Sequence, residues 1–184
     1  AIMASQGVSY VDAPVSGGVK AATEGTLVMM MGGSDQDVAK VKEIVKNYAK
    51  TITHIGGVGH GQVAKLCNQI AQVINIQGVA ESLRFAQANG ADLQKVFEAI
   101  SGGMAGSRML DLMGPKMVSR DFKAGIEARL HAKDFFLVKD AATKSHLTVT
   151  KLCACQVLLA TGLIPKKWPR NSFLAKQLLS SLNS

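Results

Sequence analysis

The chain has 184 residues, of which 47% are hydrophobic and 18% charged. This composition describes a globular protein that can bury a sizeable core, in one large domain or in a small domain plus part of another. The net charge of +8 favours anionic ligands such as acidic substrates or phosphate-bearing cofactors. An aromatic content of 5%, with basic residues spread along the chain, argues against a nucleic-acid-binding protein.

The three cysteines show no spacing typical of a disulfide framework or a zinc site, which indicates free thiols in a reducing compartment. The four histidines are scattered, so we expect no metal site. The opening "AIMASQG" lacks the basic and apolar regions of a signal peptide. We therefore expect a cytoplasmic protein, or a mitochondrial matrix protein if the source is eukaryotic.

The first part of the chain has an α/β pattern. Short apolar runs at 10–15 and 26–31 predict buried strands with a loop between them. Ser34 is typical of a helix N-cap, and a third strand is expected at 51–55. The helix after Ser34 should bury a face made of five residues: Val38, Val41, Ile44, Val45 and Tyr48. We assign residues 1–60 to this α/β portion.

From residue 61 onwards the pattern is helical. Gln62 to Asn89 contains no proline and ends at an Asn-Gly pair, which predicts one long helix. Asp92 is a candidate N-cap for the next helix. Residues 61–184 are therefore expected to form an all-helical domain, with further helices at 92–101, 107–118, 126–145 and 148–161.

A glycine-rich turn joins the two portions. It follows a strand and precedes a helix, as a dinucleotide-binding fingerprint does. Gly57 and Gly59 fit that pattern, but Gln62 stands where its third glycine should fall, so we reject the fingerprint. The glycines instead predict a tight turn that brings the start of the long helix close to another segment.

The long helix bears one charged residue, Lys65, in its first 19 positions from Gln62 to Ala80. An ordinary solvated face would mix acidic and basic residues, whereas a half-buried groove would use amides to orient a polar ligand. Burial and neighbouring positive charge lower the pKa of a lysine towards ~7–8, where it can exchange protons. The helical spacing places these amides on the side of Lys65: Gln62, Asn68, Gln69, Gln72 and Asn75.

Three motifs resemble those of the β-hydroxyacid dehydrogenases, a family that includes 3-hydroxyisobutyrate dehydrogenase and 2-hydroxy-3-oxopropionate (tartronate semialdehyde) reductase. "DAPVSGGVKAATEGTLVMMMGG" is similar to the family's substrate-binding segment, and "GGVGHGQVAKLCNQ" to the start of its catalytic helix. "LHAKD" resembles its cofactor-contacting motif. The resemblance covers about residues 5 to 160, and it implies a mainly α fold.

The fold implied is an all-helical domain like that of 6-phosphogluconate dehydrogenase, preceded by the last strands of a Rossmann domain. The resemblance implies that the Ser16 hydroxyl and the N–H groups of Gly17 and Gly18 hold a substrate carboxylate. Lys65 would be the general acid and base. The remaining implied roles are substrate orientation by Asn68 and Gln69, and contact with NAD or NADP by Lys133 and its supporting residue Asp134.

The implied function is hydride transfer between nicotinamide and a short β-hydroxy acid or semialdehyde. "NQIAQVINIQ" and "GGMAGSR" favour the tartronate semialdehyde reductase type. The family's GxGxxG turn is not in this sequence, so we expect the chain alone to be inactive. Cys67 stands in the region where phosphogluconate dehydrogenases usually show histidine, which argues against a sugar-phosphate substrate.

Three alternatives stay open. The chain could be a helical oligomerisation module without catalysis, a phosphogluconate-dehydrogenase-like enzyme, or an anion- or nucleic-acid-binding module driven by its positive charge. The oligomer and enzyme hypotheses are compatible, because members of this family commonly form dimers or tetramers through such helices. Ser16–Gly18 could also be a plain turn, and Lys133 and Asp134 a solvated ion pair.

Overall fold

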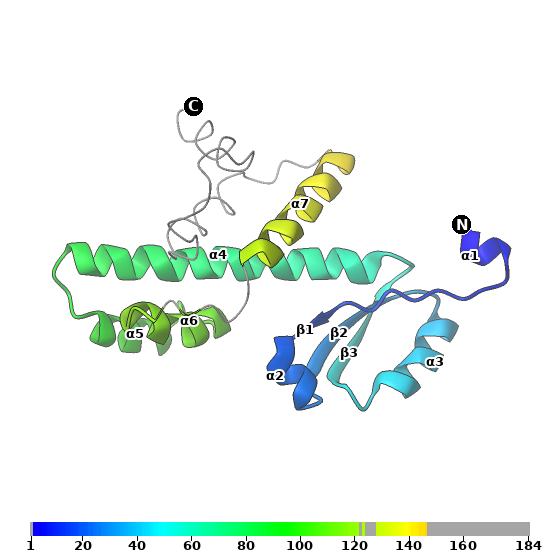
Figure 1. The fold of residues 1–184 in the computed structure, drawn as a ribbon, viewed down its shortest axis with the longest axis horizontal. Helices are drawn as coiled ribbons and strands as arrows, with labels where there is room; N and C mark the ends of the chain where they lie inside the picture. Colours follow the sequence, from blue (N-terminus) through cyan, green and yellow to red (C-terminus); the bar gives the residue numbers. More distant parts are fainter. Residues whose placement is uncertain (1, 122, 124–127, 147–184) are drawn as a thin grey trace. The chain divides into compact units, whose positions relative to one another are not determined.

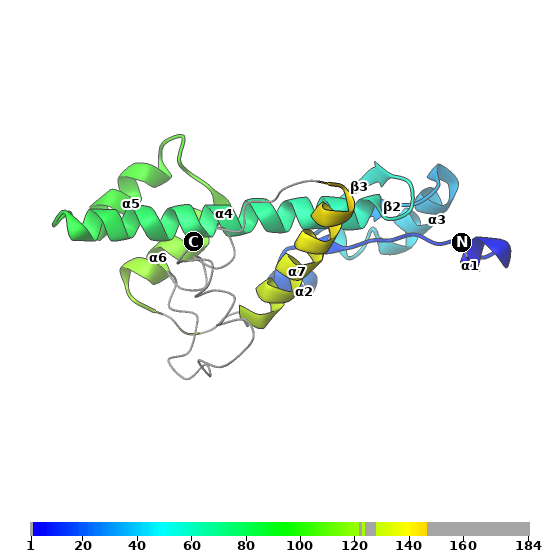
Figure 2. The same ribbon diagram turned by 90° about the horizontal axis from the view of Figure 1, so that it is seen from above.

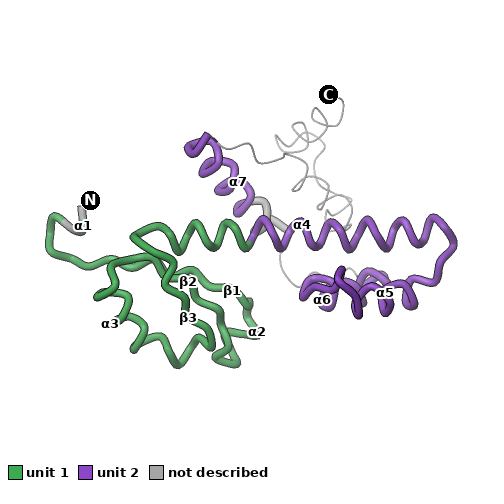
Figure 3. Tube along the Cα trace, turned by 180° about the vertical axis from the view of Figure 1, so that it is seen from behind, with its two compact units in different colours: residues 1–68 green, residues 69–184 purple. Residues whose placement is uncertain are grey.

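The computed structural model describes residues 2–121, 123 and 128–146. The chain divides into two compact units, residues 1–68 and 69–184 (Figure 3). This division lies within the long helix α4 (His60–Ala88), whereas the boundary predicted from sequence coincides with the start of that helix. The first turns of α4 belong with the first unit because they bond to its strand segment.

The first unit is built on a three-stranded sheet of order β1-β2-β3 (Figure 1). β1 (Val15–Ser16) pairs antiparallel with β2 (Leu27–Gly32), and β2 pairs parallel with β3 (Ala49–Gly56). The central strand is the most apolar, and Met31 in it is fully buried. A short helix, α1 (Ile2–Ser5), begins the described chain.

Helix α3 (Asp35–Val45) connects the two parallel strands. Ser34 caps it as predicted, since its hydroxyl accepts from the N–H of Asp37. Val38 is buried against the sheet. The predicted buried face is too wide, however, because Ile44 and Tyr48 are 65% and 54% exposed. Ile44 projects about 120° away from Val38 around the helix, and Tyr48 lies beyond its end.

Two other expectations for this unit are wrong. The strand predicted at 10–15 is reduced to β1 and an isolated bridge between Asp12 and Gly32. Pro14 lacks an N–H for a regular ladder, which accounts for the interruption. The predicted loop between the first two strands contains a helix, α2 (Gly18–Thr23), whose Ala21 packs against the sheet's core.

The second unit is helical. The long helix α4 confirms the prediction over 62–89, although it begins two residues earlier. α5 (Leu93–Ser101) is capped by Asp92 as expected, and α6 (Arg108–Val118) is capped by Ser107. Seen from above, α5 and α6 lie on either side of the C-terminal half of α4 (Figure 2). Their core contains Val79, Leu83 and Leu110.

The last described helix, α7 (Ala128–Lys144), corresponds to the helix predicted at 126–145. The helix predicted at 148–161, Cys153 and Cys155 lie outside the described residues. None of the helices within 2–121, 123 and 128–146 has the length and hydrophobicity needed to cross a membrane. The same stretches contain no group of three acidic, histidine or cysteine side chains placed to hold a metal ion.

Candidate functional site

Lys65 lies against the segment that contains the predicted carboxylate cradle. Its side chain is half-buried, and Nζ donates a hydrogen bond of 2.8 Å to the carbonyl oxygen of Val15. Val15 directly precedes Ser16, so the structure brings the lysine to the start of the Ser16–Gly18 segment although 50 residues separate the two partners. The bond lies at the solvent-accessible surface.

The two glycines after Ser16 have backbone conformations that favour glycine. Gly17 has φ of 126° and Gly18 has φ of 65°. A Cβ on Gly17 would lie 2.4 Å from the Cβ of Ala21, so a larger residue would displace α2. Ser16 is half-buried while both glycines are exposed. The turn therefore exposes the backbone of both glycines to solvent next to the half-buried Ser16.

The amide side chains of α4 differ in burial. Gln69 is 7% exposed, Asn68 and Gln72 are half-buried, and Gln62 and Asn75 are exposed. The stripe predicted from sequence is thus sheltered in its middle and open at both ends. Cys67, between Lys65 and Asn68 in sequence, is an exposed free thiol.

Gln69, Asp134 and Lys133 form a chain of polar contacts in the second unit. The amide nitrogen of Gln69 donates to Asp134 Oδ2 at 2.5 Å. Asp134 Oδ1 pairs with the Lys133 ammonium at 2.8 Å, and the two side chains are 19% and 63% exposed. The buried amide fixes the carboxylate, which in turn pairs with a solvent-exposed ammonium. The sequence did not indicate that Gln69 contacts Asp134.

Asp12 is the residue of this region that sequence reasoning missed. It is 4% exposed, and its carboxylate accepts from the N–H groups of Gly59 at 2.5 Å and Gln62 at 2.9 Å. The glycine-rich turn that resembled a dinucleotide fingerprint thus brings the start of α4 to a buried carboxylate. A signal was present in the sequence, because a charged residue between Val11 and Ala13 interrupts an apolar run.

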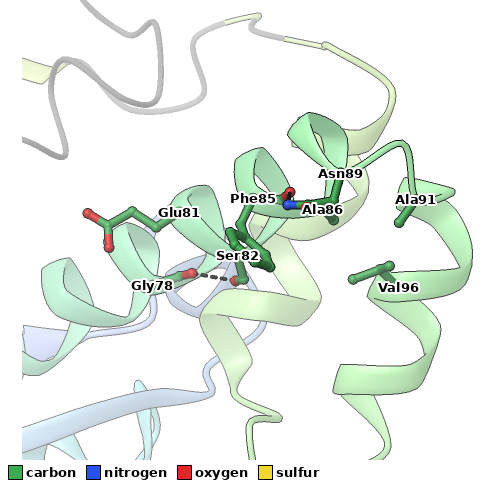
Figure 4. Close-up of a pocket in the computed structure, with 8 residues that line it drawn as sticks. All are labelled: Gly78, Glu81, Ser82, Phe85, Ala86, Asn89, Ala91 and Val96. Carbon is green, nitrogen blue, oxygen red and sulfur yellow. Dashed lines mark hydrogen bonds between the residues drawn. The ribbon is translucent and has the colours of Figure 1, made fainter.

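A separate apolar pocket of about 630 Å³ lies in the second unit (Figure 4). None of the predicted site residues lines it. Phe85, one of its lining residues, is 72% exposed. The pocket is formed by the C-terminal half of α4 with the start of α5, and its lining residues are Gly78, Glu81, Ser82, Phe85, Ala86, Asn89, Ala91 and Val96.

Comparisons with known proteins agree with the resemblance seen in the motifs. A family model described as "NAD-binding of NADP-dependent 3-hydroxyisobutyrate dehydrogenase" matches residues 59–165. A second, the NAD binding domain of 6-phosphogluconate dehydrogenase, matches residues 1–56. Both are models of nicotinamide-dependent dehydrogenases. The chain belongs to the β-hydroxyacid dehydrogenase family, so the family assignment is confirmed.

Two relatives illustrate the match in sequence. The chain is 42% identical over 155 residues to 2-hydroxy-3-oxopropionate reductase of Escherichia coli K12, covering 84% of this chain and 53% of that protein. It is also 42% identical over 132 residues to a probable mitochondrial 3-hydroxyisobutyrate dehydrogenase-like protein of Arabidopsis thaliana, covering 72% of this chain and 41% of the relative. The chain therefore spans about half the length of the curated relatives it matches.

A solved structure shows the same fold. Mycobacterium tuberculosis 3-hydroxyisobutyrate dehydrogenase, determined with L-serine, superposes with a TM-score of 0.75 at 29% sequence identity. The match covers 88% of this chain and 56% of the mycobacterial chain. The mainly helical fold with a small sheet therefore matches that of the corresponding part of the mycobacterial enzyme.

Proposed function

We propose that this chain is the substrate-binding and catalytic portion of an NAD(P)-dependent oxidoreductase acting on a short β-hydroxy acid or its semialdehyde. The supporting observation is the Lys65 ammonium, bonded at 2.8 Å to the carbonyl directly before Ser16. An amine that can exchange a proton thereby lies next to a turn of bare main-chain amides. In this proposal, residues 1–60 are the end of a Rossmann domain and residues 61–184 the helical domain.

The roles follow from the chemistry of each group. Ser16 and the amides of Gly17 and Gly18 bind the substrate carboxylate. In the oxidation direction, the neutral amine of Lys65 accepts the proton of the substrate hydroxyl at Nζ, and in reduction the ammonium returns it to the carbonyl oxygen. Asn68, three residues further along the helix, orients the substrate. Gln69 contributes by fixing Asp134.

Lys133 and Asp134 are the residues proposed to hold the nicotinamide cofactor, which supplies the hydride chemistry when bound. The polar contacts fit such a group, because Lys133 is 63% exposed and is held by a carboxylate that a buried amide fixes in turn. A cation positioned in this way suits the anionic and carbonyl oxygens of a dinucleotide. The solvated ion pair remains the alternative for these two residues.

A chimera tests the catalytic role of Lys65. In the chimera, this chain takes the place of the 53% of E. coli 2-hydroxy-3-oxopropionate reductase that it matches, and the rest of the chimera comes from the E. coli enzyme. Lys65→Ala is expected to lower turnover of tartronate semialdehyde by about 10²–10⁴-fold, the usual contribution of a general acid or base. Consumption of NADH or NADPH, followed spectrophotometrically, gives the rate of reduction. Oxidation of 3-hydroxyisobutyrate with NAD+ or NADP+ is measured separately, as the alternative substrate.

Two matched variants separate charge from proton transfer. Lys65→Arg keeps a cation but cannot exchange protons near neutral pH, so we expect it to remain nearly as slow as the alanine variant. Lys95→Ala removes an exposed lysine from α5 and should leave the rate unchanged. Near-normal turnover in Lys65→Ala with intact folding would contradict the assigned role.

A second proposal concerns assembly: the apolar pocket on α4 and α5 is covered by another copy of the chain. The 72% exposure of Phe85 supports it, because a large aromatic side chain rarely remains in water beside an apolar pocket without a partner. Sedimentation of the Phe85→Ser variant tests this proposal. The control is Val63→Ser, because Val63 is an exposed apolar residue of α4 that does not line the pocket. Only the first variant should weaken self-association, and a wild-type chain that stays monomeric at high concentration would contradict it.

A further inference from the structure

Asp12 is a buried carboxylate that the proposed reaction does not use. It is 4% exposed, and both of its oxygens accept main-chain N–H groups from the beginning of α4. A carboxylate withdrawn from water needs such partners, and the first N–H groups of a helix need an acceptor. Each group therefore satisfies the other's hydrogen-bonding requirement.

This cap comes from a distant part of the chain. α3, α5 and α6 are capped by side chains that directly precede them, namely Ser34, Asp92 and Ser107. The residue before α4 is Gly59, which has no side chain to offer. Asp12 replaces the missing local cap across 47 and 50 residues of sequence. The start of α4 is thereby fixed to another segment instead of to its own preceding loop.

The backbone of Asp12 is fixed as well. Its N–H donates to the Gly32 carbonyl at 2.9 Å, and its carbonyl accepts from the Gly32 N–H at 2.8 Å. The Asp12 carboxylate also leaves no room for a side chain at the glycines beside it, Gly32 and Gly61. A Cβ on Gly32 would lie 2.5 Å from Oδ1, and one on Gly61 would lie 2.6 Å from Oδ2. Asp12 thus links the central strand β2 to the first turn of α4 without room to shift.

A second bond between the same two segments lies three residues further along each of them. Asp12 accepts from the Gln62 N–H, and Val15 accepts from Lys65 Nζ, so both pairs are separated by 50 residues. Three residues advance an α-helix by ~4.5 Å, which is less than one turn. The capped turn and the lysine are therefore rigidly connected through the helix backbone.

We propose that Asp12 is the positioning residue of the site: by capping α4 it sets the Lys65 ammonium against the Ser16–Gly18 segment. The catalytic meaning of this contact rests on the function proposed above, whereas the contact itself does not. Loss of the Asp12 cap releases the first turn of α4, and the Lys65–Val15 bond is then populated for a smaller fraction of the time.

The test measures the reactivity of the Lys65 amine in this chain, without any need for turnover. Asp12→Asn keeps the shape of the side chain but places an amide donor against one of the two N–H groups, which leaves a buried donor unsatisfied. Reductive methylation with formaldehyde and cyanoborohydride, followed by peptide mass spectrometry, gives the rate at Lys65. We expect Asp12→Asn to raise that rate on the order of fivefold.

Asp92→Asn is the matched control. Asp92 accepts two N–H groups at the start of α5, at 2.9 and 3.1 Å, and so makes the same kind of cap without touching the Lys65 segment. It should leave the Lys65 methylation rate unchanged. Methylation of Lys95, which is exposed, gives the reference rate of an accessible amine in the wild-type chain and in Asp12→Asn.

Three outcomes decide the proposal. Faster methylation of Lys65 in Asp12→Asn alone supports it. An unchanged rate in Asp12→Asn, while hydrogen exchange at Gly59 and Gln62 becomes faster, would show a cap with no positioning role and would overturn it. Equal acceleration in both variants would overturn it too. Should Asp12→Asn not fold, Asp12→Ser, which keeps one neutral acceptor, is measured in the same way with the same criteria.

These results are separable from those on the proposed reaction. Retained turnover in Lys65→Ala would remove the catalytic role of the lysine but would leave the Asp12-dependent change in its reactivity intact. An unchanged methylation rate in Asp12→Asn would remove the positioning role while the chimera could still depend on Lys65.

Discussion

Helices α4 and α5 are both capped by an aspartate, but the aspartate comes from a distant segment in α4 and from the preceding residue in α5. Each has an aspartate carboxylate that accepts two main-chain N–H groups at or directly before its first turn. For α5 the acceptor is Asp92, two and three residues before its donors, and it is exposed. For α4 the acceptor is Asp12, which is buried and comes from the strand segment of the first unit. A local cap determines where a helix begins, whereas a distant cap also determines what the helix lies against.

The largest expected effect comes from breaking the distant cap with a methyl group. In Gly61→Ala the new Cβ would lie 2.5 Å from the Met30 carbonyl oxygen and 2.6 Å from Asp12 Oδ2. Neither the central strand nor the buried carboxylate can move away without losing its own hydrogen bonds. We expect a loss of about 3 kcal/mol in the free energy of unfolding, measured by urea denaturation.

Gly78→Ala is the control within the same helix. A Cβ there meets nothing within 4 Å, and alanine has the higher helix propensity. This variant should raise the free energy of unfolding by about 0.5–1 kcal/mol. Equal destabilisation by the two substitutions would show that the loss in Gly61→Ala does not come from the contacts with Met30 and Asp12.

The local cap should have a smaller effect. Asp92→Ala leaves the N–H groups of Gln94 and Lys95 to water, which can reach them because the cap is exposed. We expect a loss of about 1 kcal/mol in the free energy of unfolding, by the same denaturation measurement. Ser107→Ala, which removes a single bond to the N–H of Leu110, should cost a similar amount or less. A loss above that of Gly61→Ala would reverse the ranking of the two kinds of cap.

The contrast between the caps explains which parts of the molecule could be predicted from sequence. Ser34 and Asp92 were predicted correctly because a cap and its helix are adjacent in the chain. The long helix was predicted because its lack of proline is a local property. The Asp12 contacts could not be predicted in this way, since their partners lie 47 and 50 residues away.

The errors have the same origin. A strand was expected over 10–15, but those residues contact β2 through the isolated Asp12–Gly32 bridge and the two-residue strand β1 rather than through a continuous ladder. α2 was read as loop because its two glycines suggest a turn, whereas Gly17 and Gly18 only begin the helix. In the candidate site, the residues could be predicted from sequence but their contacts could not. Lys65 and Ser16 were singled out from their residue types and motifs, but their approach through Val15 depends on tertiary contacts.

The smallest expected effect concerns the local cap of α3. The hydrogen bond from the Ser34 hydroxyl to Asp37 lowers the pKa of Asp37 below its ordinary value of 3.8, with Ser9 contributing in the same direction. Because the folded-state pKa is depressed, the stabilisation is present above the unfolded pKa and is lost as the pH falls through the folded value. The carboxyl is exposed, so the change in stability is small and the pKa itself is the better observable.

Ser34→Ala should therefore raise the pKa of Asp37 towards 3.8, as followed by NMR titration of its carboxyl carbon. Glu43 provides an internal control, because its pKa is lowered by a hydrogen bond from Lys46 near the other end of α3. That pKa should stay where it is in Ser34→Ala. An unchanged Asp37 pKa would mean that the Ser34 cap acts only through the Asp37 N–H, while a shift at both residues would mean that α3 as a whole had loosened. The first outcome would give the Ser34 cap a smaller effect than expected on the first turn of α3, and the second would extend its effect to the whole helix. Either result would contradict the view that a local cap acts only on the turn next to it.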